Sequence, residues 1–295
     1  MTGPHTFSGV LTALVTPFSA DGVDEAAFRA LVRRQLDAGV HGLVPCGTTG
    51  ESPTLTGAEQ HDVVRWTIEE AAGQVPVMAG IGSNNTAAAI ANAIAFEKLG
   101  VQGVLATCPY YNKPTPEGLR LHFTAIANAV DTEVCIYDIP GRSAVKIPNG
   151  VIADLCALPN VRSVKDATGD MVNTTDLRAR VGDRLALLSG DDLTLLPFWA
   201  LGGDGCISVL SNLVPQRVVR LHALYAAGKL DDARAEVLAI HPLAQALFCE
   251  TNPIPVKAAM AHLGLCDARL RLPLSPLGEA GTATLTAAMQ NAGLV

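Results

Sequence analysis

The stretch Val161-Arg162-Ser163-Val164-Lys165-Asp166-Ala167-Thr168-Gly169 is an apolar run ending in a turn, and it indicates a buried strand that carries a lysine. Lysine is almost never fully buried without a partner, because removing an ammonium group from water costs several kcal/mol. Desolvation lowers the pKa of a lysine, so its amine can attack a carbonyl carbon. On this stretch alone, a lysine at a strand end that extends to water remains an alternative.

Apolar runs of the same kind recur along the chain and alternate with amphipathic, helix-like segments. The eight runs are residues 9–15, 42–46, 75–80, 103–107, 134–137, 161–165, 185–189 and 205–209. The helix-like segments include residues 25–38, 56–72, 86–99, 117–129, 149–158, 173–181 and 191–201. Strict alternation with short connections predicts parallel strands, in a closed barrel or in an open, doubly wound sheet. No G-x-G-x-x-G follows the first run, which weakens the dinucleotide-binding open sheet.

The strand patterns end after about residue 215, and four helices are expected beyond it. They cover residues 217–227, 230–248, 256–263 and 278–291. The predicted fold class is therefore α/β, a (β/α)8 TIM barrel with a C-terminal helical extension. We expect a catalytic barrel domain over residues 1–228 and a C-terminal helical region over residues 229–295.

Composition narrows the possible partners and compartments. Of the 295 residues, 49% are hydrophobic and 17% charged, and the net charge of −7 is spread without a basic cluster, so nucleic acid is not expected as a partner. No apolar stretch reaches the about 18 residues of a membrane span, and the first residues show no secretory signal pattern. The seven cysteines form no C-x-x-C motif. They are expected to be reduced thiols of a cytoplasmic protein.

Polar residues collect after the apolar runs, where a parallel barrel has its working face. Gly47-Thr48-Thr49-Gly50 follows the second run. Backbone N–H groups and two hydroxyls in a flexible turn can seat a small anion such as a carboxylate, although a plain helix-entry turn has the same pattern. Ser189-Gly190-Asp191-Asp192 follows the seventh run and supplies either a helix cap or a pocket wall.

Three of the four tyrosines also stand at predicted strand ends. Tyr110 and Tyr111 follow the fourth run, and Tyr137 closes the fifth. A phenol can pass a proton, but it is also common at the rim of a barrel. Arg142, soon after Tyr137, is either a bidentate clamp for a carboxylate or a solvated loop residue.

Other chemistries find little support in the sequence. The seven histidines form no H-x-H or H-E-x-x-H pair, so no metal site is expected. No G-x-S-x-G elbow and no P-loop occurs. Amine catalysis on Lys165 is the chemistry that these residues favour.

Eight motifs, in order along the chain, resemble a known family. They are GTTGESPTL (47–55), CPYYNKPTPEG (108–118), IYDIPGRS (136–143), VKDATG (164–169), LSGDD (188–192), GDGCISV (203–209), NPIPVK (252–257) and RLPLSPL (271–277). Together they resemble the dihydrodipicolinate synthase family of pyruvate-dependent class I aldolases, a superfamily that also includes N-acetylneuraminate lyase. The resemblance runs from about Gly9 to Leu277, nearly the whole chain.

The resemblance implies a role for each matched residue. Lys165 matches the lysine that forms a covalent imine with pyruvate, so no cofactor is implied. Thr48 and Thr49 match the residues that seat the pyruvate carboxylate, and Tyr137 matches a proton-relay phenol assisted by Thr49. Tyr111 matches a tyrosine that reaches the neighbouring subunit's relay, which implies a homotetramer built from tight dimers. Gly190 and Ile207 match backbone positions that line the pocket.

Arg142 separates the subtypes of this superfamily. It matches an arginine that holds the carboxylate of L-aspartate 4-semialdehyde, and the neuraminate lyases usually lack it. The implied reaction is condensation of that aldehyde with pyruvate to 4-hydroxy-tetrahydrodipicolinate, in diaminopimelate and lysine biosynthesis. The family more often has Asn at Asp138 and Thr-Gly at Ser143-Ala144. Both differences are expected to be tolerated, although the extra negative charge near Arg142 could weaken binding of a second carboxylate.

Feedback inhibition by lysine is expected to be weak or absent. The positions that match the allosteric pocket keep Asn84 and Tyr110, but Gly57 and Gln60 stand where histidines are expected, and Ala88 stands where a glutamate is expected. Without that carboxylate the lysine ammonium loses a charge-assisted hydrogen bond.

Three alternatives remain at this stage. The first is another aldolase on the same scaffold, which cleaves a 2-keto-3-deoxy sugar acid or 4-hydroxy-2-oxoglutarate; Arg142 counts against it. The second is a barrel that binds a keto acid without turnover, as a sensor or structural subunit. The third is a metal-dependent aldolase, for which the sequence offers no ligand set.

Overall fold

The computed structural model describes residues 5–295 and contains eight strands that alternate with helices. The strands are β1 (Gly9–Ala13), β2 (Gly42–Val44), β3 (Met78–Gly80), β4 (Gly103–Thr107), β5 (Glu133–Asp138), β6 (Val161–Asp166), β7 (Ala186–Ser189) and β8 (Gly205–Ser208). Each lies within or overlaps a predicted apolar run. Residues 1–4, part of the segment without a signal pattern, lie outside the described residues.

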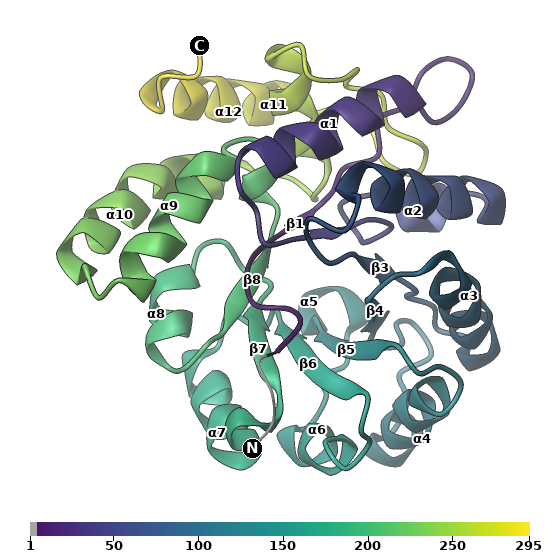
Figure 1. The fold of residues 1–295 in the computed structure, drawn as a ribbon. Coiled ribbons are helices and arrows are strands. Elements are labelled where there is room, and N and C mark those ends of the chain that lie inside the picture. The colour runs from purple at the N-terminus through teal and green to yellow at the C-terminus, as the bar shows by residue number, and fades with distance from the viewer. Residues whose placement is uncertain (1–4) are drawn as a thin grey trace.

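Helices follow the strands and surround them (Figure 1). Around the barrel they are α1 (Glu25–Asp37), α2 (Gly57–Ala71), α3 (Thr86–Leu99), α4 (Pro116–Ala127), α5 (Pro140–Ser143), α6 (Asn149–Leu155), α7 (Met171–Val181) and α8 (Leu195–Ala200). Short 3₁₀ turns are η1 (Ser52–Thr54), η2 (Gly182–Arg184) and η3 (Leu210–Asn212). The C-terminal helices are α9 (Pro215–Ala226), α10 (Leu230–Ala246), α11 (Ile254–His262) and α12 (Glu279–Asn291).

All strand pairs are parallel, and the sheet closes on itself. The strand order is β2-β1-β8-β7-β6-β5-β4-β3. A parallel bridge between Leu43 and Val77 joins the two ends of this order, and Gly80 N donates to Pro45 O there at 3.0 Å. The predicted (β/α)8 TIM barrel with C-terminal helices is therefore confirmed.

Local capping explains where several helices begin. Thr56 and Glu59 form a capping box at α2, each satisfying a backbone N–H of the first turn. The helix expected from residue 191 begins later, at Leu195, because Asp191 forms a local turn with Leu193 and Thr194 and Asp192 bonds to a different loop. Asp191 accepts from Leu193 N and Thr194 Oγ1, and Asp192 accepts from the backbone after β8.

Alternation along each strand divides the apolar residues into two layers. The larger layer lies between strands and helices, and the smaller fills the barrel interior. On β5 and β6, Ile136 and Val164 belong to the outer layer, whereas Tyr137 belongs to the inner one. Successive strand side chains point to opposite faces, so Lys165 points into the barrel beside its register partner Tyr137.

The C-terminal helices gather on one side of the barrel (Figure 1). Helix α10 packs against α9 and α12, and α11 packs against η3. The division between residues 1–228 and 229–295 stays a prediction. Within residues 5–295, no helix combines the length and the apolar character needed to cross a membrane.

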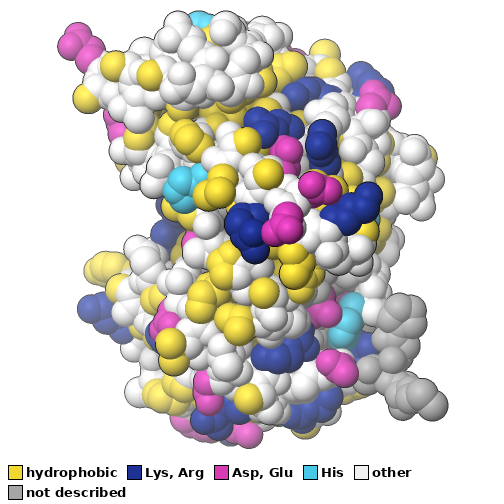
Figure 2. Space-filling model, turned by 90° about the vertical axis from the view of Figure 1, so that its left-hand side faces the viewer, with side chains coloured by type: hydrophobic (Ala, Val, Ile, Leu, Met, Phe, Trp, Pro, Cys, Tyr) yellow, Lys and Arg dark blue, Asp and Glu magenta, His cyan; other side chains and the backbone are white. Residues whose placement is uncertain are grey.

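The face over α9 and α10 carries charges of both signs (Figure 2). Basic and acidic side chains alternate there with hydrophobic ones, and this face shows no broad basic area. Arg217 on α9, for example, pairs with Glu236 on α10 at 2.7 Å.

Candidate active site

Lys165 lies at the carboxyl end of β6 and is buried, with 6% of its surface exposed. Its Nζ lies 4.2 Å from the centroid of the Tyr137 ring. Within residues 5–295, no carboxylate forms an ion pair with Lys165, in contrast to the other buried lysine, Lys257. Lys165 is therefore a buried amine next to a phenol, and it has no ion-pair partner among the described residues.

A cavity of about 60 Å³ opens at this amine. Its walls come from the ends of several strands, from the loop after β2 and from the C-terminal region. The lining includes Ala13, Val44, Gly47, Thr48, Thr49, Leu105, Tyr137, Ile139, Arg142, Lys165, Gly190, Val209, Phe248 and Asn252. Six of the eight residues that the sequence nominated therefore meet at one cavity.

The other two nominated residues, Ile207 and Tyr111, do not line this cavity. Ile207 is buried in the inner layer of the barrel, and Val209, two residues further along, lines the cavity. Tyr111 is 88% exposed and has a left-handed φ of 70°. The pocket role of Ile207 and the role of Tyr111 in a neighbouring subunit stay predictions.

Gly190 is close to the lysine for a steric reason. A Cβ at this position would lie 2.9 Å from Lys165 Cε and 2.7 Å from Ala167 Cβ. Any side chain here would displace the amine-bearing chain, so glycine lets the backbone after β7 form one wall of the cavity.

The loop after β2 brings two threonines to the cavity. Gly50 N donates to Gly47 O at 3.2 Å, and Glu51 N donates to Thr48 O at 3.1 Å, so the loop forms a tight turn. Thr49 is buried, and its Oγ1 accepts from Asn252 Nδ2 at 3.0 Å. Its own hydroxyl proton is left free to donate toward the cavity.

Glu51 anchors this loop to the C-terminal region. Its Oε1 pairs with Lys257 Nζ at 2.7 Å, and both side chains are fully buried. Lys257 Nζ also donates to Thr16 O at 2.9 Å, and Glu51 Oε2 accepts from Arg271 N at 3.1 Å. Burial lowers the pKa of Lys257, while Glu51 opposes that shift. A buried ion pair thus joins the threonine loop to α11 in the C-terminal region.

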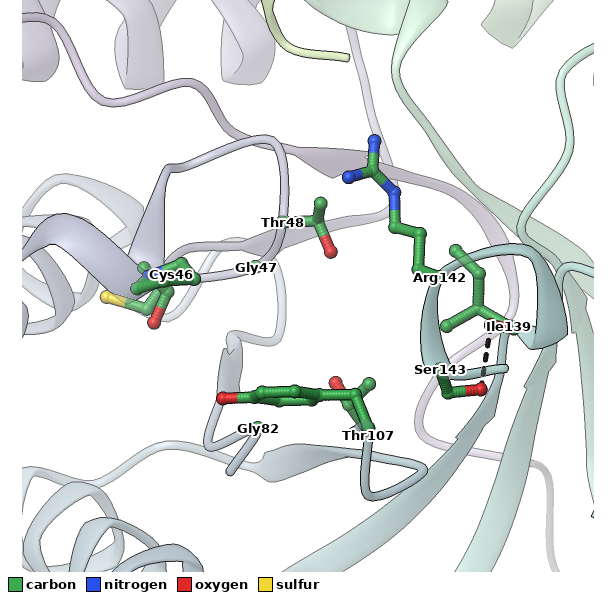
Figure 3. A pocket seen from close by; sticks show the side chains of 11 residues that line it. Cys46, Gly47, Thr48, Gly82, Thr107, Ile139, Arg142 and Ser143 are labelled. Atoms are coloured by element: carbon green, nitrogen blue, oxygen red, sulfur yellow. Dashed lines mark hydrogen bonds between the residues drawn. The ribbon is translucent and has the colours of Figure 1, made fainter. Parts of the chain in front are cut away.

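Arg142 lies on α5, the short helix after β5. Its Nη2 donates to the backbone oxygen of Asn252 at 2.8 Å. The Ser143 hydroxyl steadies the turn by donating to Ile139 O (Figure 3). The guanidinium group therefore keeps donors available at the mouth of the cavity.

A second, outer cavity of about 210 Å³ adjoins the first and is drawn in Figure 3. Its lining is Cys46, Gly47, Thr48, Ser52, Pro53, Gly82, Thr107, Tyr110, Ile139, Arg142 and Ser143. Gly47, Thr48, Ile139 and Arg142 line both cavities. The outer cavity therefore extends the space at Lys165 toward the surface past Arg142.

Two of the positions matched to the allosteric pocket, Tyr110 and Gln60, lie at or next to this outer cavity. Tyr110 and Ser52 line it, and Gln60 Nε2 donates to Ser52 O at 3.0 Å. Ala88 lies on α3 and offers no carboxylate. Weak or absent inhibition by lysine stays a prediction.

Asp138 lies behind the cavity. It is buried, follows the inward-facing Tyr137 on β5, and lines neither cavity. Its Oδ1 accepts from Ile147 N at 3.1 Å, and its Oδ2 has no hydrogen-bond partner. Burial raises the pKa of Asp138 to about 7, and the Asp166 carboxylate adds to this shift. Asp138 is thus partly protonated at neutral pH, and it lies behind the strand rather than in the cavity. Both features reduce the repulsion that it exerts on a carboxylate held by Arg142.

We expect Asp138→Asn to change how stability depends on pH. The pKa of Asp138 in the folded protein, about 7, lies above its ordinary value of 3.8, so the folded protein holds the proton more tightly between these pH values. The free energy of unfolding of the wild type should therefore fall as pH rises from about 4 to about 7, by at most about 4 kcal/mol.

The asparagine variant does not titrate at this position and should lose this fall. Urea unfolding at several pH values measures it, with the exposed Asp154→Asn as the matched control, whose curve should stay parallel to that of the wild type. Parallel curves for Asp138→Asn would contradict the expectation.

Several of these residues were not nominated from the sequence. Asn252, Lys257 and Glu51 stand in the sequence only as members of the quoted motifs, and no local pattern singles out Asn252 or Glu51. A charged Lys257 in an otherwise apolar helix start is the one signal that was present. Among residues 5–295, no three His, Cys, Asp or Glu side chains are grouped so that they could hold a metal ion.

Comparison with known proteins agrees with this geometry. The dihydrodipicolinate synthetase family model matches residues 6–292. The 4-hydroxy-tetrahydrodipicolinate synthase of Bradyrhizobium diazoefficiens is 46% identical over 299 residues, which cover 100% of both chains. The crystal structure of dihydrodipicolinate synthase from Thermotoga maritima superposes with a TM-score of 0.96 at 40% identity, covering 99% of this chain and 100% of that one.

A second solved structure, dihydrodipicolinate synthase from Acinetobacter baumannii complexed with pyruvate, has a TM-score of 0.95 at 39% identity. It covers 98% of this chain and 99% of its own. The resemblance that the motifs indicated is confirmed. A family match over nearly the whole chain, together with a relative 46% identical over its full length, shows that this chain belongs to the dihydrodipicolinate synthetase family.

Proposed function

We propose that the chain is a cytoplasmic lyase that condenses pyruvate with L-aspartate 4-semialdehyde to 4-hydroxy-tetrahydrodipicolinate, in diaminopimelate and lysine biosynthesis. The observation that carries this proposal is the meeting of Lys165, Tyr137, Thr48, Thr49 and Arg142 at one cavity. The family's curated relatives carry the synthase name, and the Acinetobacter baumannii relative holds pyruvate. The aldolases that act on sugar acids have no comparable support.

In the first half of the reaction the Lys165 amine attacks the ketone carbon of pyruvate. The carboxylate of pyruvate sits on the Thr48 and Thr49 loop, and loss of water gives an imine. The cationic imine withdraws electrons and makes the methyl group acidic. A methyl proton then leaves through a relay formed by the Thr49 hydroxyl and Tyr137. Tyr111 of a neighbouring subunit in a homotetramer completes this relay. The product of this half is an enamine, and the covalent bond to Lys165 supplies the electron sink without a cofactor.

In the second half the enamine carbon forms a bond to the aldehyde carbon of the semialdehyde, whose carboxylate is held by Arg142. The aldehyde oxygen takes up the proton that the relay removed from the methyl group and becomes a hydroxyl, while the cationic imine with Lys165 forms again. The amino group of that substrate then adds to the imine carbon. As the new carbon–nitrogen bond forms, the bond to Lys165 breaks and one proton moves from the substrate nitrogen to the lysine nitrogen. This transimination closes the ring and returns the free amine.

A panel of aldehydes tests the proposal. With pyruvate, the enzyme should form product from aspartate 4-semialdehyde and little from sugar aldehydes. Arg142→Lys should lower kcat/KM for the semialdehyde by about 10- to 100-fold, because the planar fork that matches a carboxylate is lost. Exchange of pyruvate methyl protons with deuterium should stay near the wild-type rate. Comparable turnover of sugar aldehydes by the wild type would contradict the proposed substrate.

A further inference from the structure

Asn252 connects the two halves of the candidate site. It lies between α10 and α11 and is 94% buried, since 6% of its surface is exposed. Its Nδ2 donates to Thr49 Oγ1, and its backbone oxygen accepts from Arg142 Nη2. One residue of the C-terminal region therefore contacts both the threonine of the relay and the arginine at the cavity mouth.

The remaining polar atom of Asn252 has no partner. Oδ1 is buried without a hydrogen bond, and Asn252 is one of the residues that line the cavity at Lys165. Buried carbonyl oxygens are nearly always paired, and an unpaired one at a binding cavity is an acceptor that a ligand donor can satisfy.

The orientation of the Asn252 amide, with Nδ2 toward Thr49, fits the proton relay proposed for Thr49 and Tyr137. If the amide were reversed, the Thr49 hydroxyl would donate its proton to Asn252 and could not pass it toward Tyr137. With Nδ2 on Thr49 Oγ1, the hydroxyl proton stays free, and Oδ1 is left for the cavity.

The donor for Oδ1 follows from the position of Arg142. On the proposed function, Arg142 holds the carboxylate of the aldehyde substrate, whose amino group is on the carbon next to that carboxylate. Because the guanidinium group is itself bonded to Asn252, the amino group comes close to the same residue. We propose that Asn252 Oδ1 accepts a hydrogen bond from the amino group of the second substrate, and so selects an amino aldehyde and positions its nitrogen.

The amine contact at Asn252 rests on the proposed function, and one experiment distinguishes failure of the contact from failure of that function. Asn252→Ala removes the acceptor, and Asn252→Asp keeps an acceptor toward the amine while removing the N–H that faces Thr49. Two readouts are compared at saturating pyruvate: kcat/KM for aspartate 4-semialdehyde, and the inhibition constant of succinic semialdehyde, which has the same carboxylate and aldehyde but no amine. In a ping-pong reaction kcat/KM for the second substrate reports only the steps from its binding onward.

Asn252→Ala should lower kcat/KM for the semialdehyde by about 10- to 100-fold, the worth of one hydrogen bond to a charged or strongly polar group. The inhibition constant of succinic semialdehyde should change less than about twofold. Asn252→Asp should keep the preference for the amine while it slows deuterium exchange into pyruvate, because the Thr49 hydroxyl then donates to the new carboxylate.

Equal losses for both aldehydes in Asn252→Ala would overturn the amine contact, since the Asn252 side chain would then act on a part that both aldehydes share. Loss of the amine preference in Asn252→Asp would overturn it as well. A wild-type enzyme that does not use aspartate 4-semialdehyde would instead refute the proposed function itself.

Discussion

Lys165→Ala is expected to abolish condensation, with kcat lower by about 10⁴-fold or more, as when another enzyme loses its nucleophile. The imine cannot form without the amine, and no other side chain of the cavity can supply it. Lys165→Arg is the matched variant, because it keeps a positive charge and similar length but has no neutral amine near pH 7. Borohydride added with pyruvate should label the wild type at Lys165 and label neither variant.

Lys257 provides the internal control for that labelling. It is also a buried lysine, but it is paired with Glu51 and does not line the cavity. Labelling at Lys257, or an active Lys165→Ala enzyme, would contradict the role proposed for Lys165.

Lys257→Met is expected to destabilise the protein by about 3–5 kcal/mol, because it leaves the Glu51 carboxylate buried without its counter-ion. Glu51 directly follows the Thr48–Gly50 turn, so the KM for pyruvate should rise as well. Unfolding in urea measures the first effect, and steady-state kinetics on the fraction that remains folded measure the second.

Two further variants make this prediction specific. Adding Glu51→Gln to Lys257→Met should recover part of the stability, since the uncompensated charge is then removed. The exposed pair of Arg234 and Asp231, also 2.7 Å apart, is the matched control, and Arg234→Met should cost at most about 1 kcal/mol. Equal effects at both pairs would show that burial of the Lys257 pair is unimportant.

Much of the fold was predictable because its signals are local. An apolar run of a few residues, a capping threonine or a glycine after a helix each act within one or two turns of the chain. Lys165 and Tyr137 each close an apolar run, and parallel strands place their carboxyl ends at the same edge, which is why both could be expected at the same end of the barrel. The pairing of the two residues was not predictable, because the register of β5 and β6 shifts between Val134 and Cys135.

The residues expected to bind the substrates, Thr48, Thr49 and Arg142, were identified from the family motifs and not from local patterns. GTTG and Arg142 each had an ordinary structural explanation on local grounds, and the matching of eight motifs in order singled them out. The structure adds that Arg142 and both threonines line one cavity with Lys165. It also places Asp138 behind that cavity, which residue identity alone did not indicate.

The sequence by itself determined the alternation of strands and helices, the buried lysine and the family, because these depend on neighbours along the chain. Only the tertiary structure decided that Asn252 meets Thr49 across 203 positions and that Lys257 meets Glu51 across 206. Contacts of such separation depend on how the barrel closes and how the C-terminal helices pack against it. Hydrophobic periodicity does not indicate how the barrel closes or where the C-terminal helices pack. It shows which face of α11 is buried, but any apolar surface could cover that face, whereas the hydrogen bonds of Asn252 and Lys257 form only at this position.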